Sequence, residues 1–157
     1  MCSSKVESLQ KIANEIRLRV LDIVYHTPGG HIGGSNSVTD ILIALYYEVL
    51  KHDPKRPDWE QRDYLILSKG HCCLALYSIL EKIGYTDDSY LNSYCHNGGK
   101  LGGHPKKGDA PGIEATTGSL GHGLPIGNGL AMAHKLKQKS NHIYVVLGDG
   151  EMNEGSV

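Results

Sequence analysis

Several features that define common protein classes are missing from this chain. It has no basic block and a formal net charge of −1, which argues against nucleic acid as its main partner. Hydrophobic residues make up 39% and charged residues 21%, so the composition is neither that of a disordered chain nor that of a membrane-spanning one. The first turns carry Lys5, Glu7, Lys11 and Glu15, which excludes a signal peptide. We therefore expect a cytoplasmic protein with no membrane partner.

Motifs that would mark a disulfide framework, a zinc site or a nucleotide-binding loop are also missing. The four cysteines show no C-x-x-C spacing, and Cys72 and Cys73 are adjacent, so we expect reduced thiols. No G-x-G-x-x-G follows an early strand and no P-loop is present, which disfavours a plain nucleotide-binding domain. Without an internal repeat or a linker, the 157 residues suit one domain, 1–157.

Glycine, in contrast, is abundant. Its 20 copies are about twice the usual share, and they gather in a few segments rather than scattering. Glycine lets a backbone approach a ligand closely, so glycines concentrated between periodic segments indicate loops built for ligand contact. The four glycine-rich segments are 29–34, 98–112, 118–129 and 148–155.

The hydrophobic pattern alternates between helical and strand-like segments. A capping box at Ser4 to Glu7 opens the first helix, and Ser37 or Asp40 caps the second after a glycine loop at 29–35. Helices are predicted at 5–26, after the Ser37 or Asp40 cap through Ile41 to Val49, and at 72–84, 88–95 and 124–139. Strands are predicted at 64–67 and from 142, with long connections at 52–62 and 96–120. This order predicts an α/β fold with a mainly parallel sheet flanked by helices.

The last strand leads into the most informative stretch. The run from His142 to Leu147 has the apolar, β-branched composition of a strand buried on both faces, and it breaks at Gly148-Asp149-Gly150. In an open α/β sheet, ligands bind beyond the carboxyl ends of the strands, so Asp149 is expected at the mouth of a crevice. A carboxylate beside free amides suits a magnesium ion that holds a diphosphate. The alternative is an Asp-Gly turn that caps the next helix.

Three histidines share one feature: His31, His71 and His104 each follow a glycine at or near the end of a predicted element. In a parallel α/β domain they can converge on one crevice, hydrogen-bond diphosphate oxygens and sugar hydroxyls, and transfer protons near pH 7. The alternatives are solvated loop side chains or zinc ligands.

Taken in order, these segments resemble the N-terminal, diphosphate-binding module of transketolase, and the resemblance covers nearly the whole chain. Each motif is weak alone, but five in the order of the family are specific. The matching segments are Gly30-His31-Ile32-Gly33, Ser68-Lys69-Gly70-His71 with Ala75-Leu76-Tyr77, Gly103-His104-Pro105, Ile113 to Gly121, and Gly148-Asp149-Gly150 with Glu154-Gly155.

The resemblance implies a fold and a cofactor. The fold is the diphosphate-binding (PP-type) module of the thiamine diphosphate enzymes, and the cofactors are thiamine diphosphate and Mg²⁺, or Ca²⁺ or Mn²⁺ in its place. Asp149 would ligate the metal, and the Gly150 amide would donate to a phosphate oxygen. Gly118, Ser119 and Leu120 would contact the cofactor, with the Gly118 carbonyl accepting from its 4′-amino group and Leu120 near the thiazolium.

The resemblance also implies an activity, the transfer of a two-carbon ketol unit from a ketose to an aldose phosphate. His31, His71 and His104 would orient substrate hydroxyls and move protons, and His71 would also contact the cofactor. Glu154 corresponds to a glutamate that links paired active sites across a subunit interface. As an isolated feature, Glu154 also suits the N-terminus of a helix.

Two departures point to a split enzyme. His122 stands where many long transketolases carry glutamine, and the spacer Glu151-Met152-Asn153 also resembles two-subunit forms. We therefore interpret the chain as the N-terminal subunit, or part of it, of a split transketolase. The partner would be a C-terminal, pyrimidine-binding subunit, and the assembly a homo- or hetero-oligomer such as a heterotetramer.

The sequence stops at Val157, before the residues that complete the metal motif of the family, so we expect a module that is incomplete at its C-terminus, with an open sheet edge. We expect these 157 residues alone to be catalytically inactive and to bind thiamine diphosphate weakly. A related thiamine enzyme, such as a deoxyxylulose-phosphate synthase or a pyruvate dehydrogenase component, and a non-catalytic assembly module remain alternatives.

Overall fold

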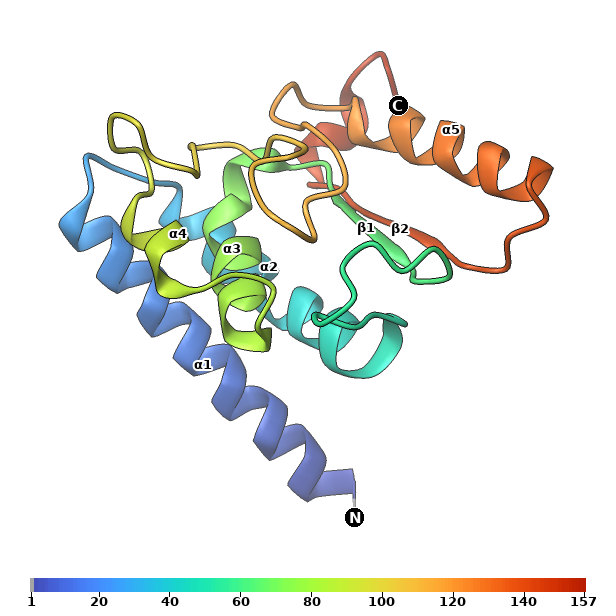
Figure 1. The fold of residues 1–157 in the computed structure, drawn as a ribbon. Helices are drawn as coiled ribbons and strands as arrows, with labels where there is room; N and C mark the ends of the chain where they lie inside the picture. The colour runs from blue at the N-terminus through green and yellow to red at the C-terminus, as the bar shows by residue number, and fades with distance from the viewer. Residues whose placement is uncertain (1) are drawn as a thin grey trace.

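The computed structural model describes residues 2–157, with side chains from residue 4 onward. The chain folds into helices around a small sheet of two parallel strands (Figure 1). The helices are α1 (Cys2–His26), α2 (Ile32–Ala44), α3 (Cys73–Ile83), α4 (Asp88–Asn92) and α5 (Gly123–Leu136), and the strands are β1 (Tyr64–Leu67) and β2 (Ile143–Val146). The predicted α/β class with a parallel sheet is confirmed. None of the helices in the described part of the chain combines the length and the apolar character needed to cross a membrane.

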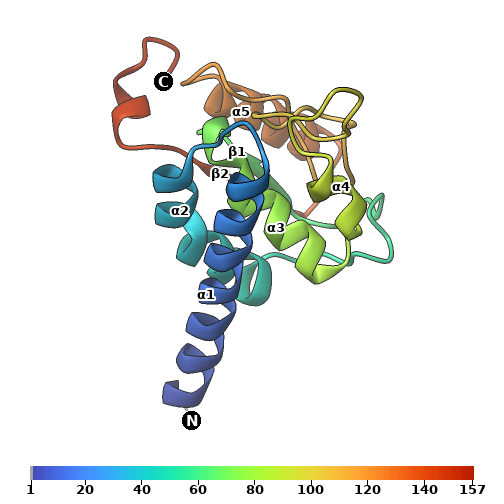
Figure 2. The same cartoon turned by 90° about the vertical axis from the view of Figure 1, so that its left-hand side faces the viewer.

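The sheet lies between two layers of helices. Helices α1, α2 and α3 pack together on one face of the sheet, and α5 covers the other (Figures 1 and 2). Side chains of β1 alternate between these layers, as expected for a strand. Leu65 and Leu67 join the core of α1 to α3, whereas Ile66 points toward Gly127 of α5.

The first helix follows its sequence pattern but begins earlier than expected. Ala13, Ile16, Val20 and Ile23 recur at helical spacing, and all four are buried against α2 and α3. The helix begins at Cys2, so Ser4 lies inside it and the predicted capping box at its start is wrong.

The second helix begins at Ile32 rather than near Ser37 or Asp40, so this prediction is also wrong. The amide of Ser35 donates to the carbonyl of His31 at 3.1 Å, which makes the glycine-rich segment the first turn of the helix. Tertiary packing requires the glycine here, because a Cβ on Gly34 would lie 2.6 Å from Sγ of Cys72. The helix then widens into a π-helical turn, Leu45–Val49.

The elements after β1 match their prediction closely. Helix α3 ends at Ile83, and its C-cap, Gly84, adopts the left-handed conformation with φ of 90°. Helix α4 begins at Asp88, and the carboxylate of Asp87 caps it by accepting from the Ser89 amide at 2.9 Å. Helix α5 begins at Gly123 and ends at Leu136, a few residues before the predicted end at 139.

The second strand differs from its prediction in burial. Residues Ile143 to Val146 pair in parallel with Tyr64 to Leu67, but all four are only partly buried. The expectation of a strand buried on both faces is wrong for the described residues. Among them β2 pairs only with β1, so one edge of the strand is left uncovered.

Candidate functional site

Both strands of the sheet end at the same edge. The amide of Ser68, directly after β1, donates to the carbonyl of Val146 at 2.9 Å, so the segments that leave the two strands start side by side. Ser68-Lys69-Gly70-His71 leads into α3, and Leu147-Gly148-Asp149 leads into a short 3₁₀ turn, Gly150–Asn153. This edge is where ligands of open α/β sheets bind.

The three histidines come together at this edge. The ring centroids of His31 and His71 lie 5.3 Å apart, and those of His31 and His104 lie 6.4 Å apart. The rings come from the start of α2, the turn before α3 and the long 96–120 connection. The predicted convergence is therefore observed, and a chemical role for these imidazoles remains a prediction.

The environment of His71 favours its neutral form. Burial is the main reason that the pKa of His71 lies below its usual value, and the neighbouring His31 and Lys69 lower it further. A neutral imidazole can accept a proton or a hydrogen bond from a substrate hydroxyl, which suits a group that works near pH 7.

The segment from Gly118 to Gly121, called the glycine wall below, lies beside the histidines. The Thr117 hydroxyl donates to the Leu67 carbonyl at 2.7 Å, which fixes this segment to the end of β1. Gly118 has φ of 139°, and a Cβ on it would lie 2.8 Å from Cδ2 of His104. A Cβ on Gly70 would lie 2.8 Å from the amide nitrogen of Gly118. This close packing brings Gly118 between His104 and the turn that carries His71. Ser119, which follows, is exposed, and Leu120 is partly buried.

Asp149 lies at the exit of β2 with an exposed carboxylate. It occupies the N-cap position of the 3₁₀ turn Gly150–Asn153, but its side chain makes no capping hydrogen bond, so the simple capping interpretation is not what the structure shows. Gly150 and Glu154 are exposed too. Glu154 lies against the glycine wall, because a Cβ on Gly121 would lie 2.7 Å from its Cβ.

The donor set fits a diphosphate-bound magnesium ion and not a cage of protein ligands. No cluster of three histidine, cysteine or acidic side chains suited to a metal exists within the described residues. Magnesium commonly binds through one or two carboxylates, with water and phosphate oxygens in the remaining positions. A single exposed aspartate followed by glycine suits that arrangement.

The sequence interpretation missed one residue of this region, Glu151. Its side chain is 3% exposed, and its carboxylate accepts hydrogen bonds from the hydroxyl of Ser68 and from the amides of Gly121 and Gly148. Burial alone would raise the pKa of Glu151, but these hydrogen bonds outweigh burial and lower it. Its place in a polar spacer after Gly-Asp-Gly offered no signal of burial.

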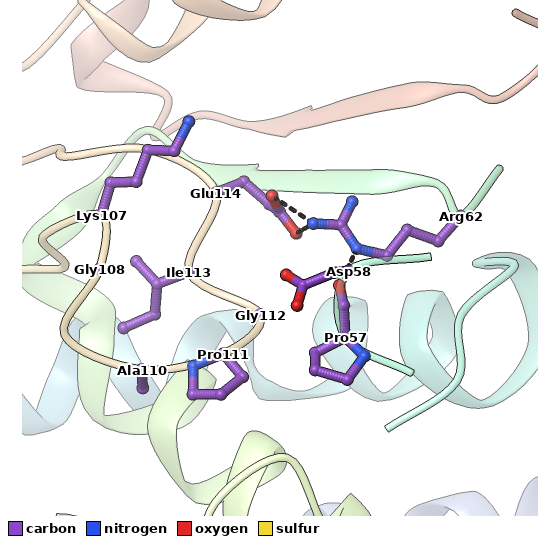
Figure 3. Close-up of a pocket in the computed structure, with 10 residues that line it drawn as sticks. All are labelled: Pro57, Asp58, Arg62, Lys107, Gly108, Ala110, Pro111, Gly112, Ile113 and Glu114. Atoms are coloured by element: carbon purple, nitrogen blue, oxygen red, sulfur yellow. Dashed lines mark hydrogen bonds and ion pairs between the residues drawn. The ribbon is translucent and has the colours of Figure 1, made fainter. Parts of the chain in front are cut away.

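A separate cavity of about 340 Å³ lies between the 57–62 connection and the 107–114 loop (Figure 3). Arg62 and Glu114 form an ion pair there at 2.9 Å, with side chains 11% and 10% exposed. Burial raises the pKa of Glu114, although Arg62 opposes the shift. Arg62 precedes β1, so this pair lies at the amino end of the strand, opposite the exit that carries the histidines.

Comparison with known proteins agrees with this geometry. Residues 8–157 match the family model described as the transketolase, thiamine diphosphate binding domain. The chain is 42% identical over 153 residues to an apulose-4-phosphate transketolase subunit of Phocaeicola vulgatus, covering 98% of this chain and 54% of that protein. It is 41% identical to the 6-deoxy-6-sulfo-D-fructose transketolase subunit SqwG of Clostridium sp., covering 95% and 54% of the two chains.

Solved structures show the same relationship. The transketolase of Campylobacter jejuni superposes with a TM-score of 0.87 at 38% identity, over 94% of this chain and 24% of that one. The transketolase of Leishmania mexicana superposes with a TM-score of 0.82 at 34% identity, over 94% and 24%. The chain thus spans about half the length of its subunit relatives and about a quarter of these solved transketolases. It belongs to the transketolase family, whose thiamine diphosphate-binding domain it matches over residues 8–157.

Proposed function

We propose that the chain is the N-terminal subunit of a split transketolase, or part of that subunit, and that it supplies the diphosphate half of a thiamine diphosphate site. The observation that carries the proposal is the convergence of His31, His71 and His104 at the edge of the sheet where Asp149 leaves β2. The two relatives named as transketolase subunits support a two-subunit enzyme.

The proposed reaction moves a two-carbon ketol unit from a ketose to an aldose phosphate. Bound thiamine diphosphate supplies the carbon nucleophile for this chemistry. The imidazoles of His31, His71 and His104 hold the substrate hydroxyls and transfer protons at those oxygens, and His71 also contacts the cofactor. Burial lowers the pKa of His71, which favours the neutral ring that can accept a proton.

The glycine wall and the β2 exit hold the cofactor. Gly118, through its carbonyl, and the neighbouring Ser119 and Leu120 orient the thiamine rings. Asp149 ligates Mg²⁺, for which Ca²⁺ or Mn²⁺ can substitute, and the Gly150 amide donates to the diphosphate. In support, the Asp149 carboxylate is exposed and makes no capping bond.

The remaining half of the site comes from a partner. A C-terminal, pyrimidine-binding subunit completes it, and the exposed Glu154 lies at the contact between paired sites in a hetero-oligomer such as a heterotetramer. The free thiols of Cys72, Cys73 and Cys95 suit assembly in the cytoplasm, and the ketol transfer suits carbohydrate metabolism of the pentose phosphate type.

Co-expression with a pyrimidine-binding partner subunit tests the proposal. We expect ketol transfer from xylulose 5-phosphate that requires thiamine diphosphate and Mg²⁺ and is lost in Asp149→Ala. Asp88→Ala is the matched control, because Asp88 is also an exposed carboxylate and lies at the start of α4, away from the site. A complex that assembles without any ketol transfer would favour an assembly module, and full activity in Asp149→Ala would contradict the assigned metal ligand.

A further inference from the structure

Glu151 is a buried carboxylate that hydrogen bonds, rather than an ion pair, compensate. It is 3% exposed, and no lysine, arginine or histidine side chain within residues 4–157 forms an ion pair with it. Burying a charge is costly unless hydrogen bonds compensate it. Three donors do so here, and each comes from a different segment of the chain.

The two oxygens of this carboxylate connect three segments. Oε1 accepts from the Ser68 hydroxyl at the end of β1 and from the Gly121 amide at 2.9 Å. Oε2 accepts from the Gly148 amide at 2.9 Å, directly before Asp149. The Ser68 hydroxyl oxygen in turn accepts from the Gly123 amide at 3.1 Å, at the start of α5. One side chain thus joins the exits of both strands to the glycine wall.

These segments are the ones to which the cofactor is assigned above. The loop before α5 contains Gly118 to Leu120, and the loop after β2 contains Asp149. Glycine-rich loops have many accessible backbone conformations. Specific contacts are therefore needed to keep the loop before α5 and the loop after β2 at a fixed distance from each other.

We propose that Glu151 is a positioning residue that holds the Gly148-Asp149 loop against the Gly118–Gly121 wall before the metal and the diphosphate bind. The expected effect on cofactor binding rests on the proposed function, whereas the connection between the two loops concerns the chain without its cofactor. Glu151 itself is buried. It acts through the backbone of Gly121 and Gly148.

Glu151→Gln isolates the role because it keeps the size of the side chain. The glutamine oxygen can replace Oε1, but its amide nitrogen then faces the Gly148 N–H, and a donor cannot accept from a donor. We expect the Gly148 amide to exchange its hydrogen about tenfold faster, the effect of losing roughly one net hydrogen bond.

Hydrogen exchange by mass spectrometry on the full, cofactor-free chain measures this loosening in peptides that cover 147–150 and 119–123. Glu81→Gln is the matched control, since Glu81 also joins two elements, accepting from Nε and Nη2 of Arg19 at 3.0 and 2.8 Å at the far end of α3. Unchanged exchange of Gly148 in Glu151→Gln would overturn the proposal. Equally fast exchange of the Gly148 amide in Glu81→Gln would overturn the proposal as well, because the effect of Glu151→Gln would then be general destabilisation.

Ser68→Ala provides a second, milder variant that decides the matter if Glu151→Gln does not fold. It removes one donor to Glu151 and the acceptor of the Gly123 amide, while the Gly148 bond remains. We expect faster exchange at Gly123 with Gly148 still protected. Exchange unchanged at Gly123 would refute the connected arrangement.

Cofactor affinity provides the functional measurement. In the complex with the partner subunit, we expect Glu151→Gln to raise the Mg²⁺ concentration for half-maximal thiamine diphosphate binding, measured by calorimetry, by roughly 10- to 100-fold, the usual effect of removing an outer support of a metal site. An unchanged Mg²⁺ requirement would refute the positioning role. If the wild-type complex itself binds no thiamine diphosphate, the proposed function fails, and the exchange measurements still decide whether Glu151 holds the two loops together.

Discussion

Replacing Gly118 by alanine tests the construction of the glycine wall. With φ of 139°, Gly118 adopts a backbone conformation that side-chain-bearing residues rarely reach, and the added Cβ would lie 2.8 Å from Cδ2 and 3.0 Å from Cγ of His104. The His104 ring is exposed and can swing outward, so the steric part of the cost is small. The backbone conformation dominates, and we expect the free energy of unfolding to fall by about 1–3 kcal/mol.

The effect on function should exceed the effect on stability. An outward swing of His104 separates it from His31, whose ring centroid lies 6.4 Å away. Misplacement of a catalytic group by about 1 Å can cost on the order of 100-fold in rate, so we expect kcat/KM of the assembled enzyme to fall by roughly that factor.

Urea unfolding of the chain and steady-state kinetics of the complex measure the two effects separately. Gly129→Ala is the matched control, because Gly129 lies inside α5 with nothing within 4 Å of an added Cβ. Alanine there should stabilise the chain by about 0.5–1 kcal/mol and leave kcat/KM unchanged. The reasoning is refuted if Gly118→Ala matches the wild type in both stability and kcat/KM.

Three further predictions concern burial and charge. Burial is the main reason that the pKa of His71 is lowered in the folded state. The neutral ring therefore stabilises the fold above the usual histidine pKa, and this stabilisation is lost as the pH falls through the lowered value. In urea titrations, His71→Gln should lose less stability than the wild type between pH 7.5 and 5.5, roughly the range around a histidine pKa. Glu114→Ala leaves the cation of Arg62 buried and unpaired and should lower the free energy of unfolding by about 3–5 kcal/mol, whereas a loss below about 1 kcal/mol would show that the pair is solvated. Leu74→Ala empties a fully buried position in α3 and should cost about 2–5 kcal/mol by the same assay; a smaller loss would mean that the core collapses into the space.

Local chemistry allowed several elements to be predicted correctly. The apolar run Tyr64 to Leu67 forms β1, and Asp87 caps α4 with its own carboxylate. These signals involve residues near one another in the chain, such as a cap and the amide two residues later. The same holds for α3, whose helical pattern ends at a glycine in the left-handed conformation.

The wrong predictions depend on contacts between distant segments. The sequence pattern places the start of α2 too late because clustered glycines usually indicate a loop, whereas Gly34 lies in the helix where it packs against Cys72. The pattern also overestimates the burial of β2, because an apolar sequence does not say how many strands will flank it.

The candidate site shows the same division. The residue types and the order of the glycine-framed motifs were enough to name His31, His71, His104 and Asp149 as candidates, because these motifs are short stretches of local sequence. Only the tertiary structure decided that the ring centroid of His31 lies 5.3 Å from that of His71 and 6.4 Å from that of His104, and that Glu151 is buried. The physical reason is that a carboxylate in a polar spacer is normally solvated. It becomes a buried acceptor only when the fold brings the donors of three distant segments around it.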